Sequence, residues 1–426
     1  MNDWRRTQTA EYDNRRHKTV KKPHYAWVIC FAGLWMILCN MGVGSSMLTI
    51  YLPFIEAQGI SHSVGSSLLT VKCLFSFLTI FAVGVDYRKL SLRLGMCIAT
   101  LIGAAGTLVY CLGGVPAYYL GASLAGIAYG AGTVYPVSLL LANWFRKDRG
   151  LAVGITSAGS GVATMLFSPI VTSVIVRHSL RTAFVLQAAF LAAGAGLIWL
   201  IVRDTPEETG REIYGGEAAE TASAQEDGQD APLPRSVLWM LAVMMLLNGG
   251  VGFSFIGHLS VLSIGCGYPA EVAARTVSLF GMLMVTGKFL TGGIADRIGT
   301  KRCSVLLLTL FFLGCLCVTG MDGRSMLWLT LLAVLLGFGS SVFNVGPPLW
   351  AAELSSRSQY ASTMRWMQLF YNLGGIAFTA VPGMIADRTG EYRTSYYLFA
   401  AMVAVSLQIL FLVYRAASHR GRFQCH

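Results

Sequence analysis

The chain has 426 residues, of which 54% are hydrophobic and only 12% are charged, and its mean hydropathy is +0.59. An average soluble domain carries about 25% charged residues, so this composition excludes an ordinary soluble protein and indicates an integral membrane protein. The formal net charge of +11 would suit a nucleic-acid-binding protein. The positions of the basic residues favour a membrane protein instead, so we expect no nucleic-acid partner.

Apolar segments of about 20 residues, long enough to cross the roughly 30 Å of a bilayer core as helices, recur along nearly the whole chain. They predict an all-α integral membrane protein with twelve transmembrane helices. The expected spans are residues 26–47, 64–84, 94–113, 118–141, 150–173, 182–203, 237–262, 273–294, 303–321, 327–350, 361–385 and 394–414.

Basic residues are distributed unequally between the two sides of the predicted membrane. In the twelve-span interpretation, 24 of the 32 lysines and arginines fall on the side that carries both termini, six fall on the other side, and Lys72 and Lys288 lie within spans. The positive-inside rule then places both termini in the cytoplasm. The first 24 residues are too charged for a secretory signal, so we expect nothing to be removed. The expected location is the plasma membrane, or the inner membrane of a Gram-negative source.

A change of composition divides the chain in the middle. From Asp204 to Pro234 the sequence is acidic and poor in large apolar residues, which is typical of a segment that does not fold by itself. We therefore predict five parts. They are a basic cytoplasmic tail at 1–24, an N-terminal six-helix bundle at 25–203, a cytoplasmic acidic linker at 204–236, a C-terminal six-helix bundle at 237–414, and a cytoplasmic tail at 415–426.

The two halves also share landmarks at a nearly constant offset. The matching pairs are Gly84-Val-Asp86 with Gly293-Ile-Ala-Asp296, Tyr135-Pro136 with Gly346-Pro347, and Leu180-Arg181-Thr-Ala-Phe184 with Tyr392-Arg393-Thr-Ser-Tyr396. Two bundles related by a parallel repeat are a known transporter architecture, with the substrate site between them near the middle of the membrane.

At these motifs the chain resembles a family. The segment Gly292-Gly-Ile-Ala-Asp296-Arg297-Ile-Gly299-Thr-Lys301-Arg302 resembles the loop signature of the major facilitator superfamily, and Gly84-Val-Asp86-Tyr-Arg88-Lys89 is a degraded copy of it. Within that superfamily, the stretch from Asn143 to Gly161 is similar to the loop and fifth helix of monocarboxylate transporters and oxalate/formate antiporters.

Lys72 and Lys288 are the only charges well inside the predicted spans, and no aspartate or glutamate lies at comparable depth. A buried cation without a protein partner favours an anionic substrate, because pairing offsets the cost of removing the charge from water. The alternative is that each lysine reaches a headgroup or backbone carbonyls with its long side chain. For Lys288 the resemblance adds that Val285-Thr-Gly-Lys288 matches the eighth-helix segment where these families have an arginine that binds substrate carboxylate.

Three positions depart from the related families. Met284 stands where proton-coupled monocarboxylate transporters have an aspartate, Ser46 falls where they have a first-helix lysine, and Asn372 falls near the eleventh-helix lysine of the oxalate/formate antiporter. These departures favour anion exchange, or a proton carried with the substrate, over a dedicated carboxylate relay. His258 is a candidate proton acceptor; the alternative is a hydrogen-bonded structural histidine.

Other polar residues of the spans are candidates to line the cavity or, alternatively, to bond between helices. They are Asn40, Ser46 and Thr49, Tyr129 and Tyr135, Asn248, Asn344, and Gln368, Tyr371 and Asn372. Pro136, Pro347 and Pro348 are expected to bend their helices.

The resemblance further implies that Asp296, with Arg297, Lys301 and Arg302, holds neighbouring helices together on the cytoplasmic side and releases them as the transporter opens inward. Asp86 is the weaker counterpart in the first half. The alternative is an ordinary solvated basic loop.

No phosphate-binding loop, catalytic triad or metal-ligand spacing occurs in the sequence, so we expect no enzyme activity, no cofactor and no metal. We predict a monomeric secondary transporter of a small organic anion, a mono- or dicarboxylate, working by alternating access as an exchanger or proton-linked symporter, with membrane lipids and protons as its other partners. The rival interpretations are an exporter of amphipathic compounds with the same fold and a membrane nutrient sensor that does not transport.

Overall fold

The computed structural model describes residues 24–56, 59–60, 62–83, 91–215 and 233–418, and this part of the chain is almost wholly helical. The helices of the first half are α2 (Tyr25–Ile37), η1 (Leu38–Ser46), α3 (Met47–Glu56), α4 (His62–Val83), α5 (Leu92–Tyr110), α6 (Val115–Gly132), α7 (Val134–Trp144), α8 (Arg149–Arg177) and α9 (Leu180–Ile201). After the short η2 (Pro206–Thr209), the second half has α11 (Arg235–Gly265), α12 (Ala270–Ile298), α13 (Thr300–Leu316), η3 (Cys317–Gly320), α14 (Met326–Gly339), α15 (Val342–Leu354), α16 (Tyr360–Phe378), α17 (Val381–Thr389) and α18 (Arg393–Ser418).

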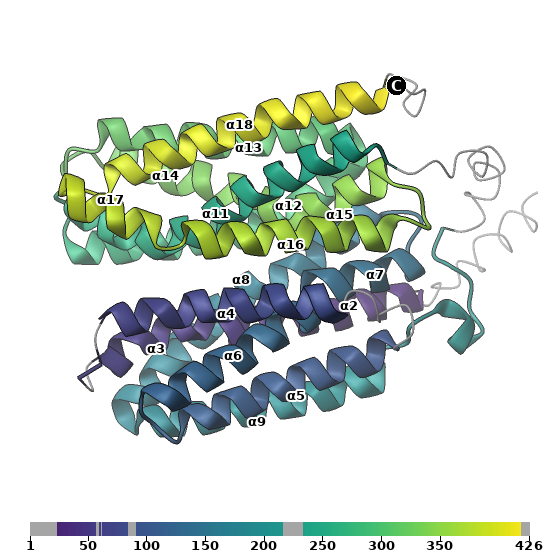
Figure 1. Cartoon of the computed structure of the whole chain (residues 1–426), viewed down its shortest axis with the longest axis horizontal. Coiled ribbons are helices and arrows are strands. Elements are labelled where there is room, and N and C mark those ends of the chain that lie inside the picture. Colours follow the sequence, from purple (N-terminus) through teal and green to yellow (C-terminus); the bar gives the residue numbers. More distant parts are fainter. Residues whose placement is uncertain (1–23, 57–58, 61, 84–90, 216–232, 419–426) are drawn as a thin grey trace, which may run out of the picture.

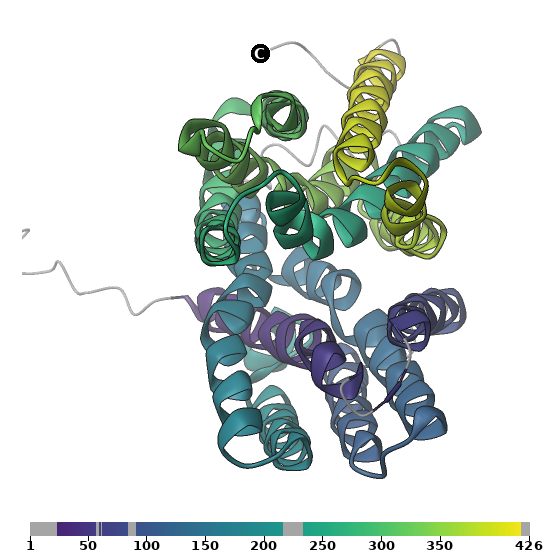
Figure 2. The ribbon, with the colours of Figure 1, turned by 90° about the vertical axis from the view of Figure 1, so that its left-hand side faces the viewer.

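The helices of each half pack chiefly with one another, as two views of the ribbon show (Figures 1 and 2). In the first half α6 packs on α4 and α5, α9 packs on α5, and α2 packs on α8. In the second half α11 packs on α16 and α18, and α14 packs on α12 and α13. The halves meet mainly where α8 contacts α12 and where α4 contacts α16. We call the end at which α9 ends and α11 begins the linker end.

Eleven helical segments of the described chain are long and apolar enough to cross a membrane. They correspond to all the predicted spans except the second. That place is taken by α4, which is 22 residues long, but its apolar part, Ser67–Ala82, is shorter than a full span. The prediction of an all-helical membrane protein is therefore confirmed, whereas the second span, the total of twelve spans and the cytoplasmic position of both termini stay predictions.

Several spans are not single regular α-helices, and the first, fourth and tenth are examples. The first contains a nine-residue π-helix, η1, between α2 and α3; π-helical turns are rare and occur frequently at functional sites. The fourth is interrupted at Thr133, whose φ of −123° and ψ of −130° end α6, and Pro136 lies in the first turn of α7. The tenth is interrupted at residues 340–341, whereas Pro347 and Pro348 lie inside α15. This interruption precedes Pro347 and Pro348, which lie within the continuous helix α15.

The first part of the acidic linker is folded onto the first bundle. The Asp204 carboxylate accepts hydrogen bonds from the backbone N–H groups of Leu92 and Arg93, both at 2.8 Å, and so caps the first turn of α5. Tyr214 donates its backbone N–H to Trp144 O at 3.0 Å, and its ring packs against Phe145. The segment from Asp204 to Pro234 is expected not to fold by itself. Its beginning is held against the first bundle, where one carboxylate and one aromatic ring supply contacts that overall composition does not reveal.

Candidate functional site

Lys288 lies in the contact between the two halves. Its side chain on α12 is 1% exposed, and its Nζ donates a hydrogen bond to Ser160 Oγ on α8 at 2.8 Å. Ser160 in turn donates to Ser157 O at 3.2 Å. An ammonium group has three N–H donors and a full charge, and a single hydroxyl satisfies only one of the donors and none of the charge. The position is therefore able to take an anion as a further partner.

Glycines allow α8 and α12 to come this close. A Cβ atom added to Gly154 would lie 2.6 Å from Lys288 O, one added to Gly161 would overlap Val285, and one added to Gly292 would overlap Gly150 O. The four glycines thus bring the backbones of the two halves into contact on either side of Lys288. This is the small-residue packing that membrane helices use where hydrophobic association is weak.

Replacing Gly154 with alanine is expected to push the two helices apart or to distort one of them, because the added methyl group meets backbone rather than a movable side chain. We expect a loss of about 1–3 kcal/mol of stability, seen as a lower unfolding temperature of the purified protein. Gly281→Ala, in the same helix α12, is the matched control, since a Cβ there has nothing within 4 Å. Equal unfolding temperatures for the two variants would contradict this account of the contact.

Lys72 is the second buried lysine. Its side chain on α4 is 8% exposed, and its Nζ lies 5.8 Å from the centroid of the Tyr129 ring on α6. Gly126 makes room for it, because a Cβ there would overlap Lys72 O. The ring offers the ammonium group a cation–π interaction rather than a counter-charge. In the described part of the chain, Lys72 and Lys288 are the only charged side chains that are buried, and neither has an ion pair with an acidic group.

A row of aromatic rings connects Lys72 with the second half. The Tyr129 ring lies 6.2 Å from that of Phe253 on α11, which lies 5.2 Å from that of Tyr371 on α16. Tyr129 and Tyr371 are each 7% exposed. The structure thus brings together Lys72 and two tyrosines that the sequence marked as cavity candidates, and adds Phe253, which no polar pattern indicates.

Two predicted amides lie where α11 and α16 are in closest contact. Asn248 is 1% exposed, and neither Nδ2 nor Oδ1 of its side chain has a hydrogen-bond partner. Asn372 is fully buried; its Nδ2 donates to Gln368 O at 2.9 Å, while its Oδ1 has no partner. A buried amide without partners costs free energy, so these atoms are candidates for contact with water or substrate.

Asn248→Leu tests this assignment. Because it removes two unsatisfied polar atoms at nearly constant size, we expect an unfolding temperature equal to or above that of the wild type, together with reduced transport. The reverse pattern, lower stability with full transport, would show that the amide serves the packing of α11. Asn40→Leu is the comparison: its Nδ2 donates to Thr100 Oγ1 at 2.9 Å between helices, so this change is expected to destabilise the protein.

The remaining candidates are not joined to either lysine by the contacts described. Tyr135 is buried in α7, and Asn344 is half-buried in α15. The Ser46 side chain lies outside the described residues. His258 is half-buried near the other end of α11, where its Nδ1 shares a hydrogen bond with Ser254 O at 2.7 Å and its ring lies 5.4 Å from that of Tyr392. This environment is typical of a hydrogen-bonded structural histidine, so it favours that hypothesis over a proton acceptor for His258.

Asp296 joins the two halves at the linker end. Its Oδ1 accepts a hydrogen bond from Gly150 N at 3.0 Å and its Oδ2 accepts one from Leu151 N at 2.8 Å. Both donors belong to the first turn of α8, where free N–H groups and the helix dipole favour a carboxylate. We call this pair of bonds the Asp296 latch.

The basic residues that were expected to hold the helices together with Asp296 do not contact its carboxylate in the described contacts. Arg297, Lys301 and Arg302 are exposed, and Lys301 Nζ lies 5.6 Å from the Tyr414 ring of α18, within its own half. In the part of the chain that the structure describes, none of these bases forms an ion pair with Asp296. The partners of Asp296 are thus backbone amides of the opposite half instead of neighbouring basic side chains. Asp86 lies outside the described residues.

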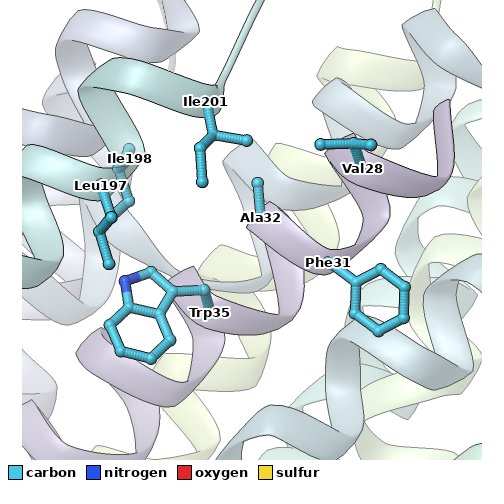
Figure 3. Close-up of a pocket in the computed structure, with 7 residues that line it drawn as sticks. All are labelled: Val28, Phe31, Ala32, Trp35, Leu197, Ile198 and Ile201. Atoms are coloured by element: carbon cyan, nitrogen blue, oxygen red, sulfur yellow. The ribbon is translucent and has the colours of Figure 1, made fainter. Parts of the chain in front are cut away.

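An apolar groove between α2 and α9 is separate from these residues (Figure 3). It has a volume of about 200 Å³ and is lined by Val28, Phe31, Ala32, Trp35, Leu197, Ile198 and Ile201. Phe31 is 62% exposed and Leu197 is 42% exposed. Such a surface is expected to face lipid chains, and the groove has no charged or titratable group with which to recognise an anion.

The structure is thus that of a helical membrane protein built from two bundles, with a buried lysine and the Asp296 latch in the contact between them. A family model described as Major Facilitator Superfamily matches residues 34–321 and 269–424. The chain therefore belongs to the major facilitator superfamily, and it is a transporter rather than an enzyme.

Individual relatives are distant. Monocarboxylate transporter 12-B of Danio rerio is 22% identical over 357 residues, which cover 76% of this chain and 74% of that protein. An MFS-type transporter of Gibberella moniliformis is 24% identical over 401 residues, covering 90% and 89%. The crystal structure of the human organic anion transporter MFSD10 has a TM-score of 0.68 at 18% identity, covering 92% of this chain and all of that one. The predicted resemblance to monocarboxylate transporters is confirmed, and the structural likeness shows the shared fold.

Proposed function

We propose that the protein is a secondary transporter of a small organic anion, a mono- or dicarboxylate, which it moves by alternating access. The observation that carries this proposal is that Lys288 is charged and buried. Its ammonium group lies between the two halves and has one hydroxyl partner, Ser160, and no carboxylate partner among the described residues. A substrate carboxylate supplies the missing counter-charge. The likeness to monocarboxylate transporters supports the same substrate class.

Lys72 supplements this positive region, and the unpartnered atoms of Asn248 and Asn372 provide hydrogen bonds for the uncharged part of the substrate. The buried charges in the described part are all positive. We therefore favour exchange of one anion for another, or movement of a proton with the substrate, over proton transfer through a buried carboxylate.

The Asp296 latch is proposed to hold the linker ends of the halves together while the opposite side is open. The proposed topology has twelve helices and both termini in the cytoplasm, so that the latch closes the inner side. The proposed location is the plasma membrane, and the proposed state is a monomer.

The competing proposal is an exporter of amphipathic compounds with the same fold, which is equally consistent with membership of the superfamily. A sensor that binds its ligand without transporting it is a third candidate function.

A counterflow experiment in proteoliposomes distinguishes the three candidate functions. A panel of labelled mono- and dicarboxylates is offered with and without a pH gradient, and empty liposomes serve as the control. Saturable counterflow of a carboxylate supports the proposal, whereas binding without movement, or movement only of uncharged amphipathic compounds, would contradict it.

A further inference from the structure

Three arginines gather at the linker end, where a loop of each half meets the other. Arg146 belongs to the connection between α7 and α8, Arg149 is the first residue of α8, and Arg357 belongs to the connection between α15 and α16. The Arg149 guanidinium lies 4.3 Å from the centroid of the Tyr360 ring, at the start of α16. We call Arg146, Arg149 and Arg357 the arginine cluster; it spans the boundary between the halves.

Several N–H groups of this cluster are buried without partners. Arg146 donates from Nη1 to Ala142 O at 3.3 Å, but its Nη2 has no hydrogen-bond partner. In Arg149 both Nε and Nη2 are buried and without a partner. A guanidinium group stays charged under all ordinary conditions, so it cannot relieve this cost by losing its proton. These three N–H-bearing atoms are therefore free to donate hydrogen bonds to an added acceptor.

The charges of the cluster also act on one another. Burial lowers the pKa of Arg146, and the positive charges of Arg357 and Arg149 lower it further. Repulsion of this kind opposes the approach of the two loops unless an anion lies between them. The mutual repulsion of the three guanidinium groups thus raises the free energy of this arrangement, and a bound anion would lower it.

Three carboxylates at or beside the ends of α8, α12 and α15 have other partners. Asp148 accepts from Tyr214 OH at 3.4 Å, Asp296 accepts from the first turn of α8, and Glu353 accepts from Tyr414 OH at 2.6 Å. Within the described ranges, no ion pair connects a carboxylate to Arg146, Arg149 or Arg357. The described carboxylates thus leave the positive charge of the cluster uncompensated by an ion pair.

We propose that Arg146, Arg149 and Arg357 form a binding site for a phosphate-type oxyanion that bridges the two halves. Guanidinium groups present paired N–H donors that match the oxygen spacing of phosphate, and three arginines suit an anion with several oxygens better than a single carboxylate. The source is either the headgroup of an anionic phospholipid or a soluble phosphate compound. The site is separate from Lys288 and does not depend on the substrate proposed for it.

Because the two halves each contribute arginines, the anion binds best when the linker ends are in contact. A ligand that binds one of two arrangements more tightly shifts the population toward that arrangement, to an extent set by the ratio of its affinities for the two. Bound phosphate is thus expected to stabilise the arrangement described here and to slow the opening of the linker end.

The test uses the full-length protein in nanodiscs, with thermal unfolding as the readout. One series titrates inorganic phosphate against chloride at equal ionic strength in phosphatidylcholine discs, and a second replaces part of the lipid with phosphatidylglycerol. The wild type is expected to unfold at a higher temperature in at least one series. Arg149→Gln and Arg357→Gln are each expected to need about tenfold more phosphate or anionic lipid for the same rise, since each loses charge-assisted hydrogen bonds. Arg235→Gln, at the exposed start of α11, is the matched control and is expected to respond like the wild type.

A rise with phosphatidylglycerol alone assigns the ligand to a lipid headgroup, and a rise with inorganic phosphate assigns it to a soluble compound. No rise in either series would overturn the proposal, as would an equal response in the wild type and both cluster variants. An equal loss in Arg235→Gln would also overturn it, because the effect would then be general surface charge. Arg357 is exposed, so Arg357→Gln remains informative if Arg149→Gln does not fold.

Discussion

Lys288→Met is expected to lower carboxylate counterflow about 10- to 100-fold, because it removes the ammonium group that pairs with the substrate anion and a charge-assisted hydrogen bond is worth about 1.5–3 kcal/mol. Its effect on stability should have the opposite sign. The wild-type protein keeps a charge buried beside a single hydroxyl, so replacing it with an apolar side chain of similar length is expected to leave the unfolding temperature unchanged or to raise it.

Two further variants separate binding from packing. Lys288→Arg retains the charge and is expected to recover much of the counterflow, although the larger planar group has to fit against Ser160. Ser160→Ala removes the hydroxyl but keeps the ammonium group, so we expect a smaller loss that appears mainly as a higher KM. Full counterflow in Lys288→Met, measured in proteoliposomes with equal protein content, would refute the assigned role of this residue.

Asp296→Ala is expected to release the latch at the linker end. The carboxylate satisfies two backbone N–H groups of α8 at once, and a cap of this kind is worth about 1–2 kcal/mol, which corresponds to about a 5- to 30-fold shift in a two-state equilibrium. Hydrogen exchange of the peptide that contains Gly150 and Leu151 should accelerate by a factor of this size. Asp296→Asn, which keeps one acceptor, should lie between alanine and the wild type.

Asp322 provides the matched control for the latch. It also accepts two backbone N–H groups, those of Arg324 at 2.9 Å and Ser325 at 2.8 Å, but within a loop of one half. Asp322→Ala is expected to accelerate exchange only in its own loop. Unchanged exchange around Gly150 in Asp296→Ala would show that the two bonds do not hold the halves together.

Much of the fold follows from the sequence because a bilayer leaves few choices. Long apolar segments have to form helices, and the glycine-rich motif ending in Arg302 is specific enough to indicate the superfamily that the family match confirms. The second span is a weaker case. The apolar segment of α4, Ser67–Ala82, includes Lys72 and is shorter than a full span, although the whole helix is 22 residues long.

The candidate site was less predictable, since its contacts join residues that are far apart in the chain. Burial of Lys288 is visible in the sequence, but its partner Ser160 lies among small residues that packing alone would explain. Asp296 was expected to work with nearby bases, and its observed partners are backbone amides 145 and 146 residues away. Backbone groups carry no sequence signal, so such a contact is found only in three dimensions.

The position of Gly292 on α12 has a mechanical consequence. It lies one helical turn from Lys288 and one turn from Asp296, so all three share a face, and each step is about 6 Å along the axis. At Gly292 the backbone touches that of Gly150, so this is a point of direct backbone contact between the halves. If α12 tilts about Gly292 as a rigid helix, Asp296 and Lys288 move in opposite directions relative to α8. Separation of Asp296 from α8 then brings Lys288 closer to α8, so the two residues cannot both move away from α8 in the same tilt.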